Sequence, residues 1–501
     1  MRTTNPLKNQ KYLSIFILIF ILLLGAFFRL YRIREYMIFL GDEGRDALIV
    51  KRIIIDHKFT LLGPITSVGS MYMGPIYYYF MVPFLWLWHF DPAGPAVMVA
   101  LFSIAAIFLL YKLGSDFFHP FTGLASAFLY AISPFTISYG RSSWNPNIVP
   151  LFSLLVIYSI LRSLVKHHYN WLIIAGLSLG VLFQLHYATF IFIPVVVICF
   201  LFIRSRIPLR NILYGFSAFI LSYAPFLLFE LRHQFVNTKG VLRFIFEPKN
   251  GSDTQTFFTF INAISDITVR IFWRPIIIEN ALLTKVFILA LIIVLTVAWK
   301  KLCIKRENCL SVKVLILWLG VGISLFGCYQ GPIYDYYFLS FFAVPFILTG
   351  LGIFMIWQNF PMGRAIALII LVILGYFNLK SSPLWSEPNN LVKNTQEIAR
   401  FVFEKTQARP YNFALIAGKN SDHAYRYFLE LWKRPPVIIE TPANDPLRNT
   451  VTTQLFVVCE EKICQPLGHP LWEIAGFGRA EIDEEWQVST ARVFRLTHFR
   501  Q

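Results

Sequence analysis

Charged residues are scarce in this chain, and their scarcity argues against a soluble protein. Only 15% of its 501 residues are Asp, Glu, Lys or Arg, whereas soluble domains carry about 25%. With 56% hydrophobic residues, a soluble fold would lack the polar side chains needed to cover its surface. Acidic residues are rarer than basic ones: the chain has 28 Asp and Glu and 45 Lys and Arg, which gives a net charge of +17.

Zinc-binding cysteine pairs and internal repeats are also missing. The six cysteines show none of the paired spacings that hold zinc, so cysteine predicts no metal site. No segment repeats along the chain, which argues against solenoids and propellers. Cys459 and Cys464 lie in the polar C-terminal part, where they either form a disulfide in an oxidising compartment or remain two free thiols.

Long uncharged blocks take the place of the missing charge, for example at 12–28, 286–299 and 365–379. A membrane-spanning helix needs about 17–25 mostly apolar residues. The first block lacks a cleavage site for removal as a secretory signal, so it is predicted to remain as a span. The sequence therefore predicts an all-α polytopic membrane bundle of about eleven transmembrane helices.

The basic residues indicate the orientation of these spans. The clearest predicted spans are 12–29, 95–112, 121–139, 147–164, 171–186, 188–204, 211–229, 284–300, 311–329, 336–357 and 363–379. With the N-terminus in the cytoplasm, the basic short loops 112–120, 162–170, 204–210, 300–308 and 358–364 all face inside, as the positive-inside rule requires. Anionic membrane lipid, rather than nucleic acid, is then the partner of the positive charge.

One apolar segment, 76–90, is left out of this count. It is short, rich in Tyr and Trp, and broken by Pro83, which favours a helix in the outer interface or a re-entrant piece. If it were an ordinary span, every later loop would change sides.

The domain boundaries follow from this topology. Residues 1–380 are predicted to form the transmembrane domain, with large extracytoplasmic loops at 30–91 and 230–283. Residues 381–501 are predicted to form a small extracytoplasmic α/β domain. Its expected helices are 392–404 and 421–432, and its expected strands are 412–417, 437–440, 455–459 and 488–496.

The segment 41–46, GDEGRD, carries the clearest chemical signal. Asp42 and Glu43 are adjacent acids that open a helical pattern shortly after the first span. A carboxylate that is partly desolvated beside a membrane suits general-base work on a hydroxyl group. Capping and the helix dipole are the alternative explanation, because acids are favoured at a helix N-terminus.

Several motifs resemble one family in their order and sidedness. They are the acidic pair after the first span, 69–79 (GSMYMGPIYYY), Ser133-Pro134 followed by Tyr139-Gly140-Arg141, and 225–235 (PFLLFELRHQF). Over roughly residues 1–380 the chain resembles the GT-C superfamily of membrane glycosyltransferases. Within it, the chain is most similar to glycosyltransferase family 39, with its protein O-mannosyltransferases and bacterial aminoarabinose transferases.

This resemblance implies transfer of a sugar from a polyprenyl phosphate to an acceptor hydroxyl, usually with inversion, on the outer face of the membrane. The acceptor is a protein, a lipid or a polysaccharide. Asp42 would be the general base and Glu43 its support. Guanidinium groups suit the leaving phosphate; the candidates for binding it are Arg141, Arg232, His233 and, more weakly, Arg45. Contact with lipid headgroups is the alternative for each arginine.

One departure from the family pattern concerns Met73. Relatives often carry Lys or His before the Pro of this segment, so another cation such as Lys58 or Arg232 would be needed. The family has members with and without a metal; since no strong ligand set is visible here, no metal and no cofactor are expected, although a divalent metal stays open.

The sugar or acceptor pocket is predicted from polar and aromatic residues at outer span ends. Aromatic rings stack on sugars and carboxylates bind hydroxyls, while an interfacial aromatic belt is the alternative. The candidates are Tyr139, Asn145, His186, Tyr187, Tyr334 and Asp335.

Two other functions compete with the transferase. A transporter or flippase of lipid-linked glycans should carry repeats and ionisable residues near the membrane midplane. The middles of the predicted spans are almost free of charge, which favours chemistry at one surface. A glycan polymerase or ligase is closer in chemistry and would differ in its donor.

Overall fold

The computed structural model describes residues 6–66, 71–202, 207–246, 257–278, 280–418 and 420–499. The start of the 69–79 motif and Arg204 and Arg206 of one basic loop therefore lie outside the described residues. The chain forms two compact units. The first comprises Met1–Tyr31, Phe59–Phe80 and Val97–Glu387, and the second comprises Arg32–Lys58, Met81–Ala96 and Pro388–Gln501. The second unit therefore joins the C-terminal part to two earlier segments, 32–58 and 81–96. The predicted C-terminal domain, 381–501, did not contain these two segments.

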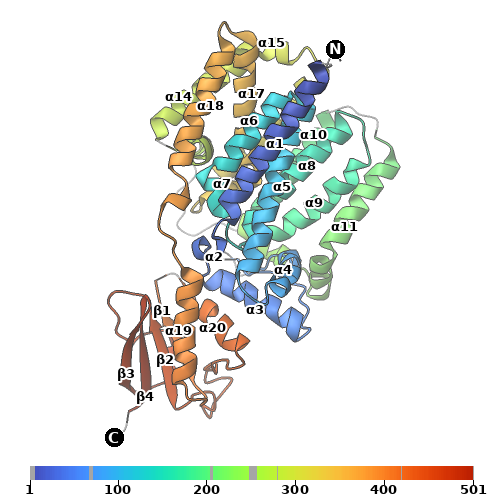
Figure 1. Cartoon of the computed structure of the whole chain (residues 1–501). Coiled ribbons are helices and arrows are strands. Elements are labelled where there is room, and N and C mark those ends of the chain that lie inside the picture. Colours follow the sequence, from blue (N-terminus) through green and yellow to red (C-terminus); the bar gives the residue numbers. More distant parts are fainter. Residues whose placement is uncertain are drawn as a thin grey trace. The chain divides into compact units, whose positions relative to one another are not determined.

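The first unit is helical (Figure 1). Its helices are α1 (Pro6–Leu30), α6 (Pro120–Ile132), α7 (Pro134–Tyr139), α8 (Val149–Leu164), α9 (Trp171–Leu185), α10 (Phe192–Phe202), α11 (Leu209–Arg232), α12 (Val236–Phe246), α13 (Phe257–Phe272), α14 (Ala281–Val297), α15 (Trp299–Leu302), α16 (Arg306–Gly327), α17 (Ala343–Asn359) and α18 (Gly363–Lys380). Short 3-10 turns are η1 (Asn145–Ile148), η2 (Tyr187–Ile191), η4 (Asp335–Ser340) and η5 (Pro383–Trp385), and η3 (Trp273–Ile277) is a π-helix. Helices α4 (Ile76–Leu87) and α5 (Ala93–Phe117) contribute residues to both units.

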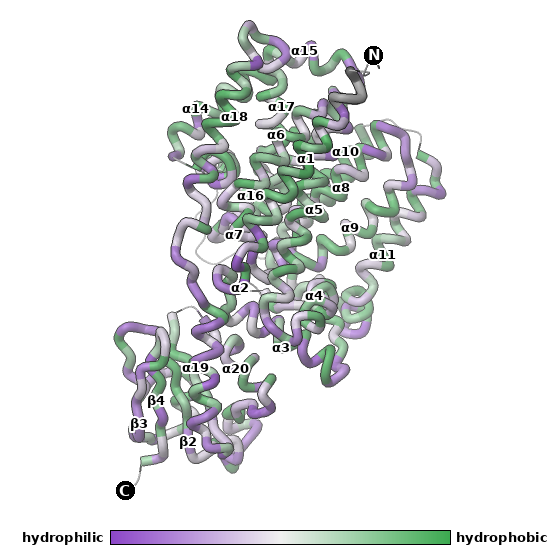
Figure 2. Tube along the Cα trace, in the orientation of Figure 1, coloured by the Kyte–Doolittle hydropathy of each residue, from purple (hydrophilic) through white to green (hydrophobic). Residues whose placement is uncertain are grey.

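Membrane-spanning length and composition are found in six helices of the described residues. They are Lys11–Leu30, Ala93–Phe117, Asn145–Leu164, Leu209–Arg232, Arg306–Gly327 and Gly363–Lys380. The bent pair Phe257–Ile277 and Ala281–Val297 would make a seventh, and five further apolar helices are shorter. Figure 2 shows hydrophobic residues along most of these helices. The chain is therefore a multi-pass membrane protein, while the count of about eleven spans stays a prediction.

Glycine sets the spacing between α9 and its neighbour α11. A Cβ at Gly176 would lie only 1.9 Å from the carbonyl oxygen of Gly215, and one at Gly180 would lie 2.0 Å from Ser222 Oγ. Small residues allow such close backbone approach between membrane helices. Next to this contact, Gln184 Nε2 donates to the Ser222 carbonyl at 2.7 Å. The pair is thus joined by packing and by a hydrogen bond.

A fully buried arginine joins α1 to three neighbouring helices. The Arg29 guanidinium donates to Ser103 Oγ of α5 at 2.7 Å, to the Ala131 carbonyl of α6 at 2.9 Å and to Thr136 Oγ1 of α7 at 3.2 Å. These neutral acceptors replace the water that a buried cation loses. Arg29 therefore fixes the C-terminal end of α1 against these helices.

The second unit contains the only sheet of the described residues. Its helices are α2 (Ile33–Tyr36), α3 (Gly41–Ile55), α19 (Leu391–Lys405), α20 (His423–Leu431) and α21 (Trp472–Ala475), and its strands are β1 (Asn412–Ile416), β2 (Gln454–Cys459), β3 (Ala480–Val488) and β4 (Ala491–His498). The strand order is β1-β2-β4-β3, with β1 and β2 parallel and the other pairs antiparallel. The predicted small C-terminal α/β fold is confirmed.

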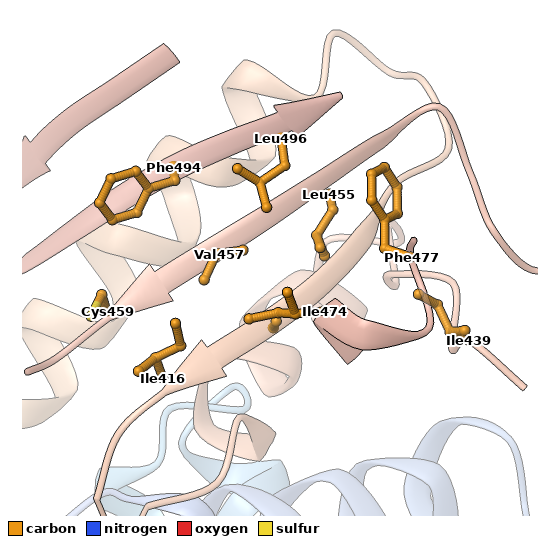
Figure 3. Packing of buried hydrophobic residues seen from close by; sticks show 10 residues of the cluster. Ile416, Ile439, Leu455, Val457, Cys459, Ile474, Phe477, Phe494 and Leu496 are labelled. Carbon is orange, nitrogen blue, oxygen red and sulfur yellow. The ribbon is translucent and has the colours of Figure 1, made fainter. Parts of the chain in front are cut away.

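The core of this sheet is apolar and continuous. Figure 3 shows Leu455 and Val457 of β2 beside Leu496 and Phe494 of β4, all of them buried. Phe477, from the segment after α21, packs at one end of the same cluster. The alternating apolar residues of β2 and β4 thus provide the surface on which the rest of the cluster packs.

Two details of the second unit differ from the sequence prediction. The strand predicted at 437–440 is not formed; only Val437 makes an isolated bridge, to Asn412. Strand β3 was not predicted, because its run of acids hides the alternating pattern of a strand at the sheet edge.

Two pairs of cysteines that lie close together in the sequence form disulfides. Cys459 and Cys464 form a disulfide, which decides between the two alternatives left by the sequence. Cys303 and Cys309 form a second one. This second pair lies in a loop that the predicted topology puts in the cytoplasm, where disulfides are rare.

Candidate functional site

The acidic pair lies in the first turn of α3, and glycines determine how that turn packs. A Cβ at Gly41 would lie 1.9 Å from Ser421 Oγ, and a Cβ at Gly44 would lie 2.4 Å from the Cα of Ala424. The Gly41 N–H donates to Asn420 Oδ1 at 2.9 Å. Only glycine fits these two positions, so the start of α3 rests directly on the segment that opens α20.

Asp42 is the accessible acid of the pair. Its side chain is 55% exposed, and its Oδ1 lies 2.8 Å from Nη1 of Arg45. The same guanidinium binds the buried carboxylate of Asp46, at 2.9 Å. Since Asp46 holds Arg45 in place, Arg45 in turn orients the exposed carboxylate of Asp42.

Glu43 is the buried acid of the pair. Its Oε2 accepts a hydrogen bond from the Leu40 N–H at 3.0 Å, as capping residues do at a helix start. Burial raises the pKa of the Glu43 carboxyl from 4.5 to about 7, and the hydrogen bond from Leu40 opposes the rise. The two adjacent acids therefore differ in their access to solvent, as their different directions along the helix predict.

His423 is a residue of this site that sequence reasoning missed. Its charge interacts with that of Asp42, and its Nδ1 lies 2.9 Å from Ser421 Oγ. Burial lowers the pKa of His423, and the nearby Asp422 acts in the opposite direction. The two glycines that flank the acids were the available signal, because glycine in a helix start often marks close approach of another backbone.

In the first unit, several predicted pocket residues form one aromatic group, the Tyr334 cluster. Its members are Tyr139, Trp144, His186, Tyr334, Tyr336 and Tyr337. Tyr336 is central: its ring centroid lies 4.6 Å from that of Trp144 and 5.8 Å from that of His186, and Tyr334 stacks on it at 5.7 Å. Residues from three separate turns of the chain are thus brought together.

Asp335 gives this cluster a charged edge. Its Oδ1 accepts from Arg270 Nε at 2.9 Å, and its Oδ2 lies 3.3 Å from Arg274 Nε. The Tyr139 side chain interacts electrostatically with both Asp335 and Arg274. Arg270 and Arg274 were missed by the sequence analysis; a signal existed, since both lie in the predicted outer loop 230–283.

Asn145 and Tyr187 lie beside these groups but bond to the backbone. Asn145 Nδ2 donates to the Leu185 carbonyl at 2.6 Å, and the Tyr187 hydroxyl donates to the Tyr72 carbonyl at 2.5 Å. Both side chains therefore fix the turns around His186.

The arginines predicted to bind phosphate have different surroundings. Arg141 is buried, and its guanidinium donates to the Phe28 and Tyr31 carbonyls at 2.5 and 2.6 Å, so it caps the end of α1. This geometry differs from the predicted phosphate contact. Arg232 is exposed at the end of α11, and the exposed His233 stacks on Phe229 at 4.1 Å. Within the described residues, no hydrogen bond, ion pair or ring contact joins Arg232 or His233 to the Tyr334 cluster.

Metal ligands are not gathered anywhere in the part of the chain that the structure describes: no three His, Cys, Asp or Glu side chains form a suitable group there.

Comparison with known proteins supports the resemblance stated above. The model of the family of dolichyl-phosphate-mannose-protein mannosyltransferases matches residues 73–229. No curated protein matches the chain. Among solved structures, ArnT from Cupriavidus metallidurans in the apo state has a TM-score of 0.61 at 12% identity, covering 98% of both chains.

Two other similar structures contain a lipid carrier. ArnT from the same organism bound to undecaprenyl phosphate has a TM-score of 0.62 at 13% identity and covers 97% of this chain and 98% of its own. The oligosaccharyltransferase AglB from Archaeoglobus fulgidus, with an inhibitory peptide and a dolichol-phosphate, has a TM-score of 0.52 at 13% identity, covering 89% and 69%.

The resemblance predicted from the motifs is confirmed: the chain has the fold of the GT-C family glycosyltransferases, and its residues 73–229 match the dolichyl-phosphate-mannose-protein mannosyltransferase family.

Proposed function

We propose that this protein transfers a sugar from a polyprenyl-phosphate donor to an acceptor hydroxyl on the outer face of the membrane, with inversion. The observation that carries this proposal is the exposed carboxylate of Asp42 at the start of α3, in a chain with the fold of ArnT. The lipid phosphates bound to ArnT and to AglB support a donor of the same chemical class.

Asp42 acts as the general base. Its carboxylate removes the proton of the acceptor hydroxyl as the hydroxyl oxygen attacks the anomeric carbon. The bond from that carbon to the phosphate oxygen breaks, the polyprenyl phosphate leaves with the electron pair, and the proton passes from Asp42 to solvent. Arg45 keeps the carboxylate in one orientation. Glu43, buried behind it, holds the helix start and supports the base.

The leaving phosphate needs a cation, and two arginines are well suited. Arg274 is half exposed, stands 3.3 Å from Asp335 and stacks over Trp273, which leaves N–H groups free of the ion pair to bind oxygen. Arg232 is exposed at the end of α11. Arg141 instead stabilises α1 through backbone carbonyls.

The Tyr334 cluster with Asp335 forms the sugar or acceptor contact. Stacked rings bind the C–H faces of a sugar, and a carboxylate binds its hydroxyls. Tyr334, which is 55% exposed, is the member most open to a ligand, and the other members are half-buried.

The decisive experiment is transfer of a radiolabelled sugar by the purified full-length protein. Polyprenyl-phosphate sugars are offered with membrane extracts as acceptor. Asp42→Asn should reduce transfer by about 100-fold or more, since general-base catalysis contributes about 10²–10⁴-fold. Asp56→Asn, a carboxylate at the other end of α3, is the matched control and should leave the rate unchanged. Near-normal transfer by a folded Asp42→Asn variant would remove Asp42 from this role.

Three further measurements test the donor and the orientation of the protein in the membrane. Arg274→Gln and Arg232→Ala should raise the KM for the donor; if neither does, the phosphate assignment fails. Transfer of an oligosaccharide from a lipid diphosphate, instead of a monosaccharide from a monophosphate, would identify a glycan ligase. A reporter fused to the C-terminus should be active only outside the cytoplasm, and activity inside would reverse the topology.

A further inference from the structure

The C-terminal part of the second unit contains a hollow that the proposed reaction does not use. Its volume is about 380 Å³, at the lower end of small-molecule sites, which measure about 300–1,000 Å³. The described residues that line it are Arg448, Val451, Phe477, Gly478, Arg479 and His498, so two arginines and a histidine meet there without an acid.

Each polar group of the hollow is held in place by its own neighbours. Arg448 Nη2 donates to the Gly476 and Phe477 carbonyls at 2.8 and 3.2 Å. Arg479 stacks on the Phe499 ring at 4.2 Å, and His498 stacks on Phe477 at 4.3 Å, nearly parallel. Stacking occupies the face of a guanidinium and leaves the N–H groups at its edge available for oxygen.

The hollow lies next to the buried core of the sheet. Phe477 belongs to the buried core of the sheet, where Figure 3 shows it beside Leu455. Gly478 follows with φ +96°, a conformation that favours glycine, and a Cβ there would lie 3.1 Å from Arg448 Nη2. The backbone thus turns closely around the guanidinium. Cationic edges that are held in place bind a ligand with little loss of side-chain freedom.

We propose that this hollow binds an oxyanion, a phosphate or carboxylate, carried on a body of the size of a sugar. The arginine edges match the paired oxygens of such a group, and the partly exposed Val451 beside them contacts the attached ring. The ligand is either a soluble anionic sugar or the headgroup of an anionic lipid, since both present this chemistry.

The test uses the full-length protein in neutral detergent and three probes: inorganic phosphate, glucose 1-phosphate and glucuronate. Binding is measured by calorimetry and located by hydrogen exchange of the segments around 448 and 477–479. Arg479→Gln should weaken binding about tenfold or more, as loss of a charge-assisted contact does. Arg409→Gln removes the same charge from an exposed position of this unit and should change nothing. Arg448→Lys, which keeps the charge but loses the planar edge, should also weaken binding.

Controls separate this hollow from the proposed donor site. Arg274→Gln should leave the exchange protection around 448 and 477–479 intact, whatever it does to transfer. Binding only to vesicles that contain phosphatidic acid, still dependent on Arg479, would assign the hollow to a lipid headgroup. The proposal is overturned if neither the three soluble probes nor the phosphatidic-acid vesicles protect these segments, or if Arg479→Gln and Arg409→Gln behave alike.

Discussion

Replacement of Glu43 by Gln should remove a pH dependence from the stability of the protein. The carboxyl has a pKa of about 7 in the folded chain and 4.5 as its reference value. Below pH 4.5 both states are protonated and burial of the neutral acid is not penalised. As the pH rises from 4.5 to 7 the unfolded chain loses the proton first, so the folded state loses about 1.4 kcal/mol of stability per pH unit. The total penalty, complete above pH 7, is about 3 kcal/mol.

Glutamine keeps an oxygen that can accept the Leu40 N–H but cannot ionise. Thermal unfolding of the full-length protein should therefore be followed at fixed scan rate between pH 4.5 and 7.5 for the wild type and Glu43→Gln. The variant should gain relative stability as the pH rises. Glu404→Gln, an exposed acid paired with Arg400 on α19, is the control and should track the wild type. Parallel curves for wild type and Glu43→Gln would refute the argument that burial controls this acid.

Two further predictions concern packing in the first unit. Gly176→Ala should destabilise the protein by about 1–3 kcal/mol, because the added methyl group would overlap the Gly215 carbonyl of α11. Gly320→Ala is the control and should be neutral, since a Cβ there meets nothing within 4 Å. Equal melting temperatures of the two variants would contradict this prediction. Arg29→Leu should lower the free energy of unfolding by about 3 kcal/mol or more, because it leaves buried acceptors without a donor. Arg29→Lys should restore only part of this stability. Thermal unfolding in detergent measures both effects. Full recovery with lysine would mean that charge alone matters.

Local patterns in the sequence were enough to predict part of the site. Asp42 and Glu43 were expected at a helix start because their neighbours repeat with helical spacing, and Tyr334 and Asp335 were expected to act with their aromatic neighbours. His423 was not predicted: Gly41 and Gly44 indicate that another backbone approaches the acids, but which segment it is depends on packing between parts distant in sequence. The direction of the Arg141 guanidinium, toward the Phe28 and Tyr31 carbonyls, also depends on distant packing and was not predicted.

In the fold, too, the elements with a clear local sequence pattern were predicted and an element without one was not. The helices α19 and α20 follow from their apolar periodicity, and β2 and β4 follow from alternation. Strand β3 escaped prediction because an edge strand needs little apolar surface and uses charge to avoid pairing with other chains.

The contact of α3 with α20 has a consequence for any exchange of parts between relatives. Gly41 and Gly44 fit only a partner backbone of matching shape, and Asn420 completes the fit. In a chimera that replaced only residues 388–501 with those of a relative, α3 would pack against a surface of a different shape, and Asp42 and Glu43 would be displaced. Grafts should therefore transfer 32–58 together with the tail, as one inherited piece.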